Sequence, residues 1–198
     1  VYDRRVGGDV LEFGVSGFLW ESNMVMYNRP DRNGEENFWS QSRGDQVVGS
    51  QVGTKLVHHP MQLMTFAELA DRHPLAQVLS SQTGYARDYG FFPYGNYDES
   101  ERLIFQTSEF SDAFHPKEMF YIVPHDGASL ALQESAIPLE GVEVFKHRGE
   151  SYTLTAHADG SFEVSHHVDG VLPGYYEMWF SWATHHQNDG VVLGGSTE

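Results

Sequence analysis

The chain has 198 residues, of which 40% are hydrophobic and 14% aromatic, enough to bury a core as one domain or as two fused halves. Its formal net charge of −16 repels phosphate backbones and anionic lipid headgroups, so we expect no nucleic-acid partner and no membrane insertion. The sequence contains no cysteine, which excludes a disulfide, a thiolate nucleophile and a cysteine-ligated metal within this stretch.

The first part of the chain predicts strands followed by one helix. Short β-rich runs separated by Gly, Asn and Pro occupy residues 9–58 and are typical of strands joined by turns. A helix is predicted over residues 66–73, because Thr65 and Glu68 are spaced as a capping box and Pro74 follows.

An irregular aromatic stretch follows at residues 83–100, where Tyr, Phe and Gly recur without periodicity. Because aromatic side chains are costly to leave in water, we expect an ordered loop that packs against the rest of the protein. Within it, Arg87 is predicted to be mostly buried, with its guanidinium bonded to a carboxylate or to backbone carbonyls. A strand is expected to resume at residues 102–105.

A β-hairpin is predicted from residues 119–123 and 128–132, which flank an Asp126–Gly127 turn. A second helix is expected over residues 177–186.

Another hairpin is predicted over residues 151–167. We interpret Asp159–Gly160 as its two-residue turn, a register that would place Thr155 opposite Val164 and Thr153 opposite His166.

An ungapped similarity joins residues 64–79 to residues 178–193, with Met, Phe, Val and Leu at matching positions. We therefore predict a mainly β protein with two short helices, built as two pseudo-repeated β units packed in one compact body. The expected division is a first β unit with its closing helix over 1–80, a bridging segment of loop and hairpins over 81–143, and a second, shorter β unit with its closing helix over 144–198.

Several arginines are set among aromatic residues and are candidates for binding a small anionic ligand. They and their aromatic neighbours are Arg4, Arg29, Trp39, Arg87 and Tyr89. The alternative is that each arginine has an internal carboxylate partner, since an unpaired buried charge is costly.

Eleven histidines invite a metal hypothesis, because neutral imidazole binds zinc and copper well. Adjacent histidines on a strand point to opposite faces, so we expect no single doublet to hold an ion and look for a site that combines separate elements. The candidate ligands are His166, His167, His185, His186 and Asp189. The alternative is that these histidines are solvated or hydrogen-bonded.

The leading functional prediction is a non-enzymatic binding or accessory domain for a metal, zinc or copper, or for a small anion. A metal-assisted hydrolase that uses His and Asp residues is one alternative. A structural subunit of a larger assembly is another, if the aromatic stretch is exposed. The protein is expected to be a monomer or a homodimer.

Several runs of the sequence resemble one large bacterial and archaeal family, the domain of unknown function 3179. These runs are 13–29, 38–41, 83–90, 115–118 and 179–182. The resemblance implies a mostly β, internally duplicated, usually exported domain, and brings no established activity or catalytic residue. Members of the family typically carry a Cys-Pro-x-Cys segment just before the position of Val1. The resemblance thus leads us to expect an extracytoplasmic protein, periplasmic or secreted, whose signal lies upstream of Val1.

Overall fold

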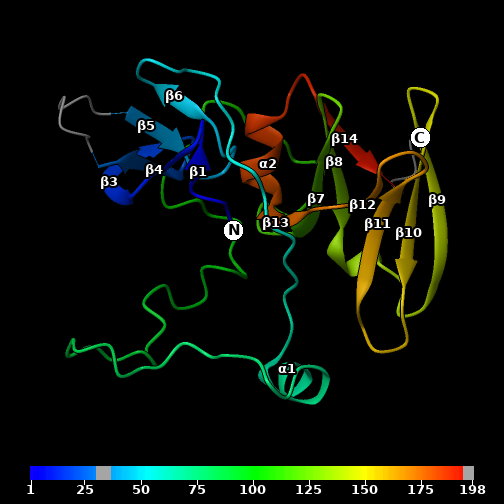
Figure 1. Ribbon diagram of the computed structural model, residues 1–198, viewed down its shortest axis with the longest axis horizontal. Coiled ribbons are helices and arrows are strands. Elements are labelled where there is room, and N and C mark those ends of the chain that lie inside the picture. The colour runs from blue at the N-terminus through cyan, green and yellow to red at the C-terminus, as the bar shows by residue number, and fades with distance from the viewer. Residues whose placement is uncertain (30–36, 194–198) are drawn as a thin grey trace.

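The computed structural model describes residues 1–29 and 37–193 and confirms a mainly β protein with two short α-helices (Figure 1). The described strands form three four-stranded sheets and one small two-stranded hairpin. We call the large sheets the N-terminal, central and side sheets.

The N-terminal sheet has the strand order β3-β4-β5-β6 and is antiparallel throughout. Its strands are β3 (Phe13–Trp20), β4 (Asn23–Asn28), β5 (Asn37–Ser40) and β6 (Gln46–Val48). The small hairpin precedes it and consists of β1 (Arg5–Val6) and β2 (Asp9–Val10).

The central sheet has the order β13-β7-β8-β14, with β14 parallel to β8 and the other pairs antiparallel. Its strands are β7 (Met119–His125), β8 (Ala128–Gln133), β13 (Tyr175–Met178) and β14 (Gly190–Leu193). The predicted hairpin across Asp126–Gly127 is confirmed, and both turn residues have positive φ, 45° and 70°, as the tight two-residue turn requires.

The side sheet has the order β12-β11-β10-β9. Its strands are β9 (Gly141–His147), β10 (Glu150–Ala156), β11 (Phe162–His166) and β12 (Gly170–Leu172). A 3₁₀ turn over Glu134–Ala136 follows β8. The central sheet thus takes strands from both sides of the expected boundary at residue 143.

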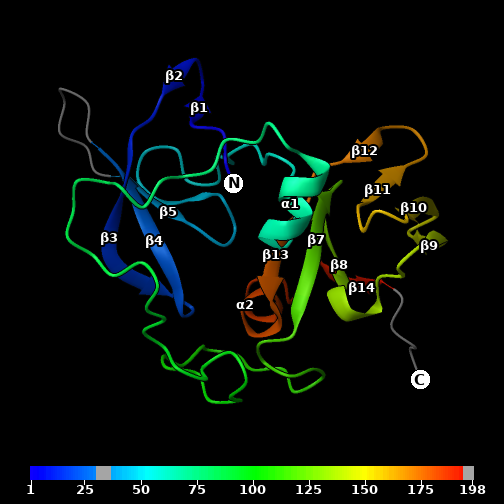
Figure 2. The same cartoon turned by 90° about the horizontal axis from the view of Figure 1, so that it is seen from below.

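The central sheet is covered on both faces. Its strand β7 is apolar at consecutive positions, which is the pattern expected of a strand buried on both sides. Tyr121 and Val123 pack toward the side sheet, in a core with Leu154 and Val164. Phe120 faces the other way and packs on helix α2 (Trp179–His185). Figures 1 and 2 show α2 between the central sheet and the N-terminal sheet.

Helix α1 (Phe66–Arg72) begins as predicted. The Thr65 hydroxyl accepts from the Glu68 amide at 3.2 Å, and the Glu68 carboxylate accepts from the Thr65 amide at 2.7 Å, which completes the capping box. None of its residues is buried, whereas α2 buries Trp179 and Trp182. The two helices therefore have different environments, and the structure does not confirm the internal duplication.

The hairpin of β10 and β11 is present, but the predicted register is wrong by one residue. Leu154, not Thr155, lies opposite Val164. The His157 amide donates to the Ser161 carbonyl and the Gly160 amide to the His157 carbonyl, so the loop has three residues and ends at Gly160 with φ 80°. This register places the apolar residues of both strands on the buried face.

Residues 66–110, which we call the exposed segment, contain no buried residue. The expectation that the aromatic loop packs is wrong: Tyr85 is 76% exposed and Phe91 69%. The strand expected at 102–105 is absent as well. In Figure 1 much of this segment, with α1, runs below the three sheets. Within the described residues, no helix has the length and apolar character needed to cross a membrane.

Candidate metal centre

Histidines and carboxylates from four places in the chain meet where the central and side sheets adjoin. His125 ends β7, Glu150 begins β10, His166 ends β11, and Asp169 lies in the turn that leads into β12. The core beneath the group is formed by Tyr152, which lies opposite His166 in the side sheet and is 2% exposed. The register of β10 and β11 therefore fixes where the cluster forms.

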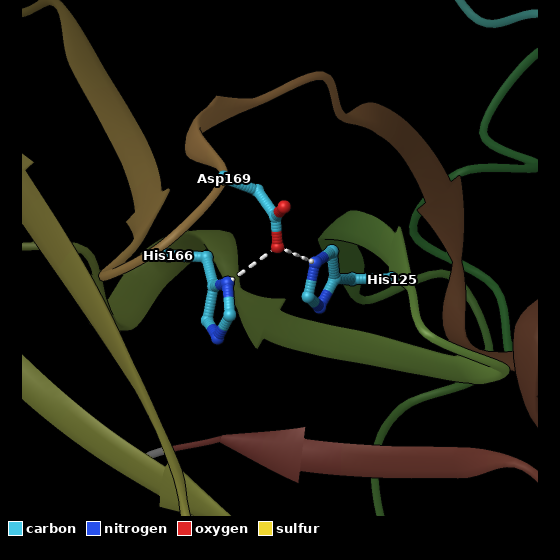
Figure 3. Close-up of side chains that lie close together, drawn as sticks. All are labelled: His125, His166 and Asp169. Atoms are coloured by element: carbon cyan, nitrogen blue, oxygen red, sulfur yellow. Dashed lines mark hydrogen bonds and ion pairs between the residues drawn. The ribbon is translucent and has the colours of Figure 1, made fainter.

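The Asp169 carboxylate joins the two histidines (Figure 3). Its Oδ2 atom lies 2.6 Å from Nδ1 of His166 and 3.0 Å from Nε2 of His125. The three ligand atoms lie within 4.8 Å of one another, as a first coordination shell requires.

The remaining nitrogen of each histidine also has an oxygen partner. Nε2 of His166 lies 3.0 Å from Oε2 of Glu150, and Nδ1 of His125 lies 3.1 Å from the Tyr152 hydroxyl. Both imidazoles are thus held at two points, which fixes the direction in which each presents its other nitrogen to Asp169.

The second histidine of the doublet turns toward the same group. Nδ1 of His167 lies 3.4 Å from Oε2 of Glu150, and the two imidazole rings are 4.4 Å apart between centroids. The expectation that neighbouring histidines diverge is wrong here, because His166 is the last residue of its strand and His167 already belongs to the turn. Glu150, His166 and His167 form a second possible ligand set on the other nitrogen of His166.

The charges within the cluster favour proton or cation binding. Burial opposes the charged form of His166, yet its hydrogen bonds with Glu150 and Asp169 outweigh that effect and raise the pKa of His166 above its ordinary value. The hydrogen bond with His125, followed by the one with His166, lowers the pKa of Asp169. A positive charge at this point is therefore stabilised by two carboxylates.

His125, His166 and Asp169 could hold a zinc or copper ion if the three side chains moved slightly apart. Ligand atoms about 2.1 Å from a tetrahedral zinc are about 3.4 Å from one another. The bonds from Asp169 to His166 and His125, at 2.6 and 3.0 Å, are shorter because they are hydrogen bonds. The Asp169 side chain is 54% exposed in a turn, so a shift of this size meets little packing resistance.

The other predicted metal ligands lie elsewhere. His186 Nδ1 pairs with Asp189 Oδ1 at 3.0 Å, and His185 approaches Asn23 at 3.4 Å and the Trp20 ring. His185, His186 and Asp189 do not join His166 and His167 in any group of three ligands among the described residues. The predicted combination of α2 with the hairpin is therefore wrong.

The predicted anion-binding residues are partly paired within the protein. Arg29 forms an ion pair with Glu12 at 3.0 Å, and Arg4 donates to the Leu11 carbonyl at 3.4 Å. Trp39 is buried and donates to Asn28 at 2.8 Å.

Arg87 and Tyr89 lie in the exposed segment. The prediction that Arg87 is buried is wrong, and its guanidinium has no hydrogen-bond partner among residues 1–29 and 37–193. The hydroxyl of Tyr89 bonds to Thr83 at 2.6 Å.

Sequence reasoning missed His125, Glu150 and Asp169. Two signals could have found them: the spacing His-His-x-Asp before Gly170, and the position of His125 directly before a turn that was predicted correctly. Glu150 required the true register of the hairpin, which a three-residue loop determines.

The fold and this cluster define a mainly β domain with a histidine–carboxylate centre at the junction of two sheets. The chain belongs to the family described as protein of unknown function (DUF3179), which matches residues 1–171 and so includes every residue of the cluster. No curated protein and no solved structure matches the chain.

Proposed function

We propose that this protein is an exported binding domain that holds one divalent transition-metal ion, zinc or copper, between His125, His166 and Asp169. One observation carries the proposal: each histidine directs one nitrogen to Asp169 while an oxygen of Glu150 or Tyr152 holds the other. Metal-ligating histidines have this arrangement, because an outer hydrogen bond fixes the tautomer and makes the ligand more basic. Export rests on the usual character of the family that the sequence resembles.

The set with Asp169 is preferred over the set with His167 for a physical reason. Side chains of His125 and His166 are 14% and 6% exposed, so their positions are set by packing. Glu150 and His167 are 45% and 54% exposed and would lose more conformational freedom on binding an ion. When His166 ligates through Nδ1, its Nε2–H donates to Glu150, which acts as the outer partner.

The test is calorimetric titration of the protein with Zn²⁺ and with Cu²⁺ after treatment with a chelator. We expect one equivalent to bind, and His166→Ala and His125→Ala to weaken binding at least tenfold. Glu150→Gln removes the charged outer partner and should weaken binding by about 10–100-fold. His157→Ala is the matched control, because His157 is exposed at the far end of the same hairpin.

Two results would contradict the proposal. One is unchanged binding in His166→Ala, which would assign the ion to scattered surface histidines. The other is a double variant, His125→Ala with His166→Ala, that still binds the ion as tightly as His157→Ala does. Asp169→Asn keeps the size of the side chain and serves as the ligand variant if an alanine substitution impairs folding.

A metal-assisted hydrolase remains the enzymatic alternative. Two histidines and one carboxylate leave a coordination position for water, as in catalytic zinc sites. Hydrolysis of a simple ester by the zinc-loaded protein, lost in His166→Ala and kept in His157→Ala, would support it.

A structural subunit of a larger assembly is a second candidate function, supported by the exposed segment. Its aromatic and aliphatic side chains are largely in solvent, with Leu79 99% exposed and Phe92 58%. Exposed apolar surface of this kind is typical of interaction sites. Solution mass tests it, since a monomer that persists at high concentration would contradict self-assembly.

A further inference from the structure

A cavity of about 420 Å³ lies on the face of the central sheet opposite the histidine cluster. It is bounded by the start of the chain and the N-terminal sheet on one side and by β13 and α2 on the other. Residues that line it include Tyr2, Ser42, His58, Met61, Tyr175 and Glu177. Its volume falls within the range of about 300–1,000 Å³ that small-molecule sites occupy.

Glu177 is the one carboxylate among the described residues that line this cavity. Its side chain lies on β13 and is 8% exposed. The hydroxyls of Ser42 and Ser181 both donate to Oε1. Oε2 is buried and has no hydrogen-bond partner of good geometry within the described part of the chain, although the Tyr175 hydroxyl interacts with the same carboxyl group. A buried acceptor without a partner is costly and rare, so it points to a group that the protein does not itself supply.

Glu177 forms no ion pair among the described residues, although the α-amino group of Val1 also lines the cavity, 3.9 Å from Sδ of Met61. No Lys or Arg side chain lines the cavity within residues 1–29 and 37–193. Burial lowers the pKa of His58 to about 4, so its imidazole is neutral at pH 7. Burial also raises the pKa of Tyr2 and of Tyr175, which keeps both phenols neutral.

Three of these residues form an aromatic stack that lines the cavity beside Glu177. The His58 ring stacks on Tyr175 with centroids 4.5 Å apart and an interplanar angle of 11°, and the Tyr2 ring lies 4.5 Å from His58 on a tilt of 56°. Neutral aromatic faces attract organic cations. Met61 and Phe180 add apolar surface for a hydrocarbon body.

We propose that this cavity binds a small organic ammonium ion, which donates to Oε2 of Glu177 while its hydrocarbon part lies against the aromatic and thioether side chains. The ligand cation supplies the partner that Oε2 lacks. The net charge of −16 raises the local concentration of such cations near the protein. This site is separate from the metal centre, so a negative result for one proposal does not contradict the other.

The alternative to a bound ammonium ion is a proton on the Glu177 carboxyl group. Burial raises the pKa of Glu177, so the acid can remain neutral and donate its own hydrogen to a water molecule in the cavity. A neutral Glu177 would bind an alcohol as readily as an amine. An ionised Glu177 would bind the amine, as its ammonium ion, more tightly than the alcohol.

The experiment compares 2-phenylethylamine and cyclohexylmethylamine with 2-phenylethanol, the neutral counterpart of the first, by calorimetry and by the shift in Tm. We expect both amines to bind to the metal-free protein at neutral pH, and at least one to bind tenfold or more tightly than the alcohol. Glu177→Gln preserves an acceptor for Ser42 and Ser181 and should weaken amine binding at least tenfold. Glu140→Gln removes the same charge from an exposed position and should leave binding unchanged.

Three outcomes would overturn the proposal: equal binding of amine and alcohol, amine binding that survives Glu177→Gln, or no binding of either amine. The comparison of amine with alcohol uses the unaltered protein, so it decides the question even if Glu177→Gln does not fold.

Discussion

The exposed segment and the central sheet with α2 contain the same kinds of aromatic residue in opposite environments. Phe120 and Trp182 are 0% and 3% exposed, whereas Tyr85 and Phe91 are 76% and 69% exposed. The difference is regularity: β7 alternates its side chains between two covered faces, while residues 83–100 form no strand or helix. Aromatic content therefore indicates burial only where a regular element gives the side chains a common direction.

The substitution Trp182→Ala tests this contrast with the largest expected change in the free energy of unfolding. Its indole stacks on Phe120 and donates to the Ser129 hydroxyl at 2.8 Å, so truncation leaves a cavity and an unpaired hydroxyl. We expect the free energy of unfolding to fall by about 3–5 kcal/mol. Phe105→Ala, in the exposed segment, should cost less than about 1 kcal/mol. Urea denaturation of both variants measures the difference, and equal costs would break the comparison.

The elements that local chemistry determines were predictable from sequence. The capping box of Thr65 and Glu68 and the tight turn at Asp126–Gly127 each depend on a few neighbouring residues, and both are present. The predicted register of the hairpin at Asp159 was wrong by one residue, because Asp-Gly occurs in both two-residue and three-residue loops. The choice between a two-residue and a three-residue loop depends on which face of the side sheet is buried, and that is set by tertiary packing.

The candidate site was predictable only in part for the same reason. His166 and His167 were among the candidate ligands, but the residues that approach them include His125, 41 residues before His166, and Glu150, 16 residues before it. Only the packing of the central sheet on the side sheet brings these positions together. The prediction that Arg87 is buried was wrong because residues 83–100 form no helix or strand that would direct their side chains toward a core.

Metal binding should increase the difference in local stability between the sheets that carry the histidine cluster and the exposed segment. An ion that binds the folded protein alone stabilises it by about 2.7 kcal/mol at a free concentration of 100 times Kd. Amides of β7, β10 and β11 should then exchange more slowly with solvent, while those of the exposed segment, which open locally, should not change. Hydrogen exchange with Zn²⁺ and with excess chelator measures this. Slowing in the exposed segment alone would place the ion elsewhere.

Acidification should destabilise the core region through His185 of α2. Burial, then the positive charges of His186 and Arg43, lower the pKa of His185 to about 4, below its ordinary value of 6.5. The unfolded chain therefore binds more protons between these values, so this contribution is present above about pH 6.5 and is lost as the pH falls toward about 4. After allowance for partial exposure we expect a loss of roughly 1–2 kcal/mol.

His185→Gln should reduce this pH dependence, measured as the free energy of unfolding from pH 7 to pH 4. His73→Gln alters an exposed histidine just after α1 and is the matched control. A parent and a His185→Gln variant with the same slope would show that His185 is not held neutral by the core.

The smallest effect is expected for Arg87→Ala. A buried guanidinium bound to a carboxylate would cost about 3 kcal/mol or more on removal, because its partner would be left unpaired. Arg87 is exposed, and no hydrogen bond of its guanidinium is present among the described residues, so we expect a change well under 1 kcal/mol. Arg87→Lys should be equally mild. Thermal melts of both variants at low protein concentration measure the folded monomer. A loss of several degrees in Tm for Arg87→Ala that Arg87→Lys restores would instead show that the exposed segment contacts an acidic group in solution, and would remove the contrast between the two aromatic regions.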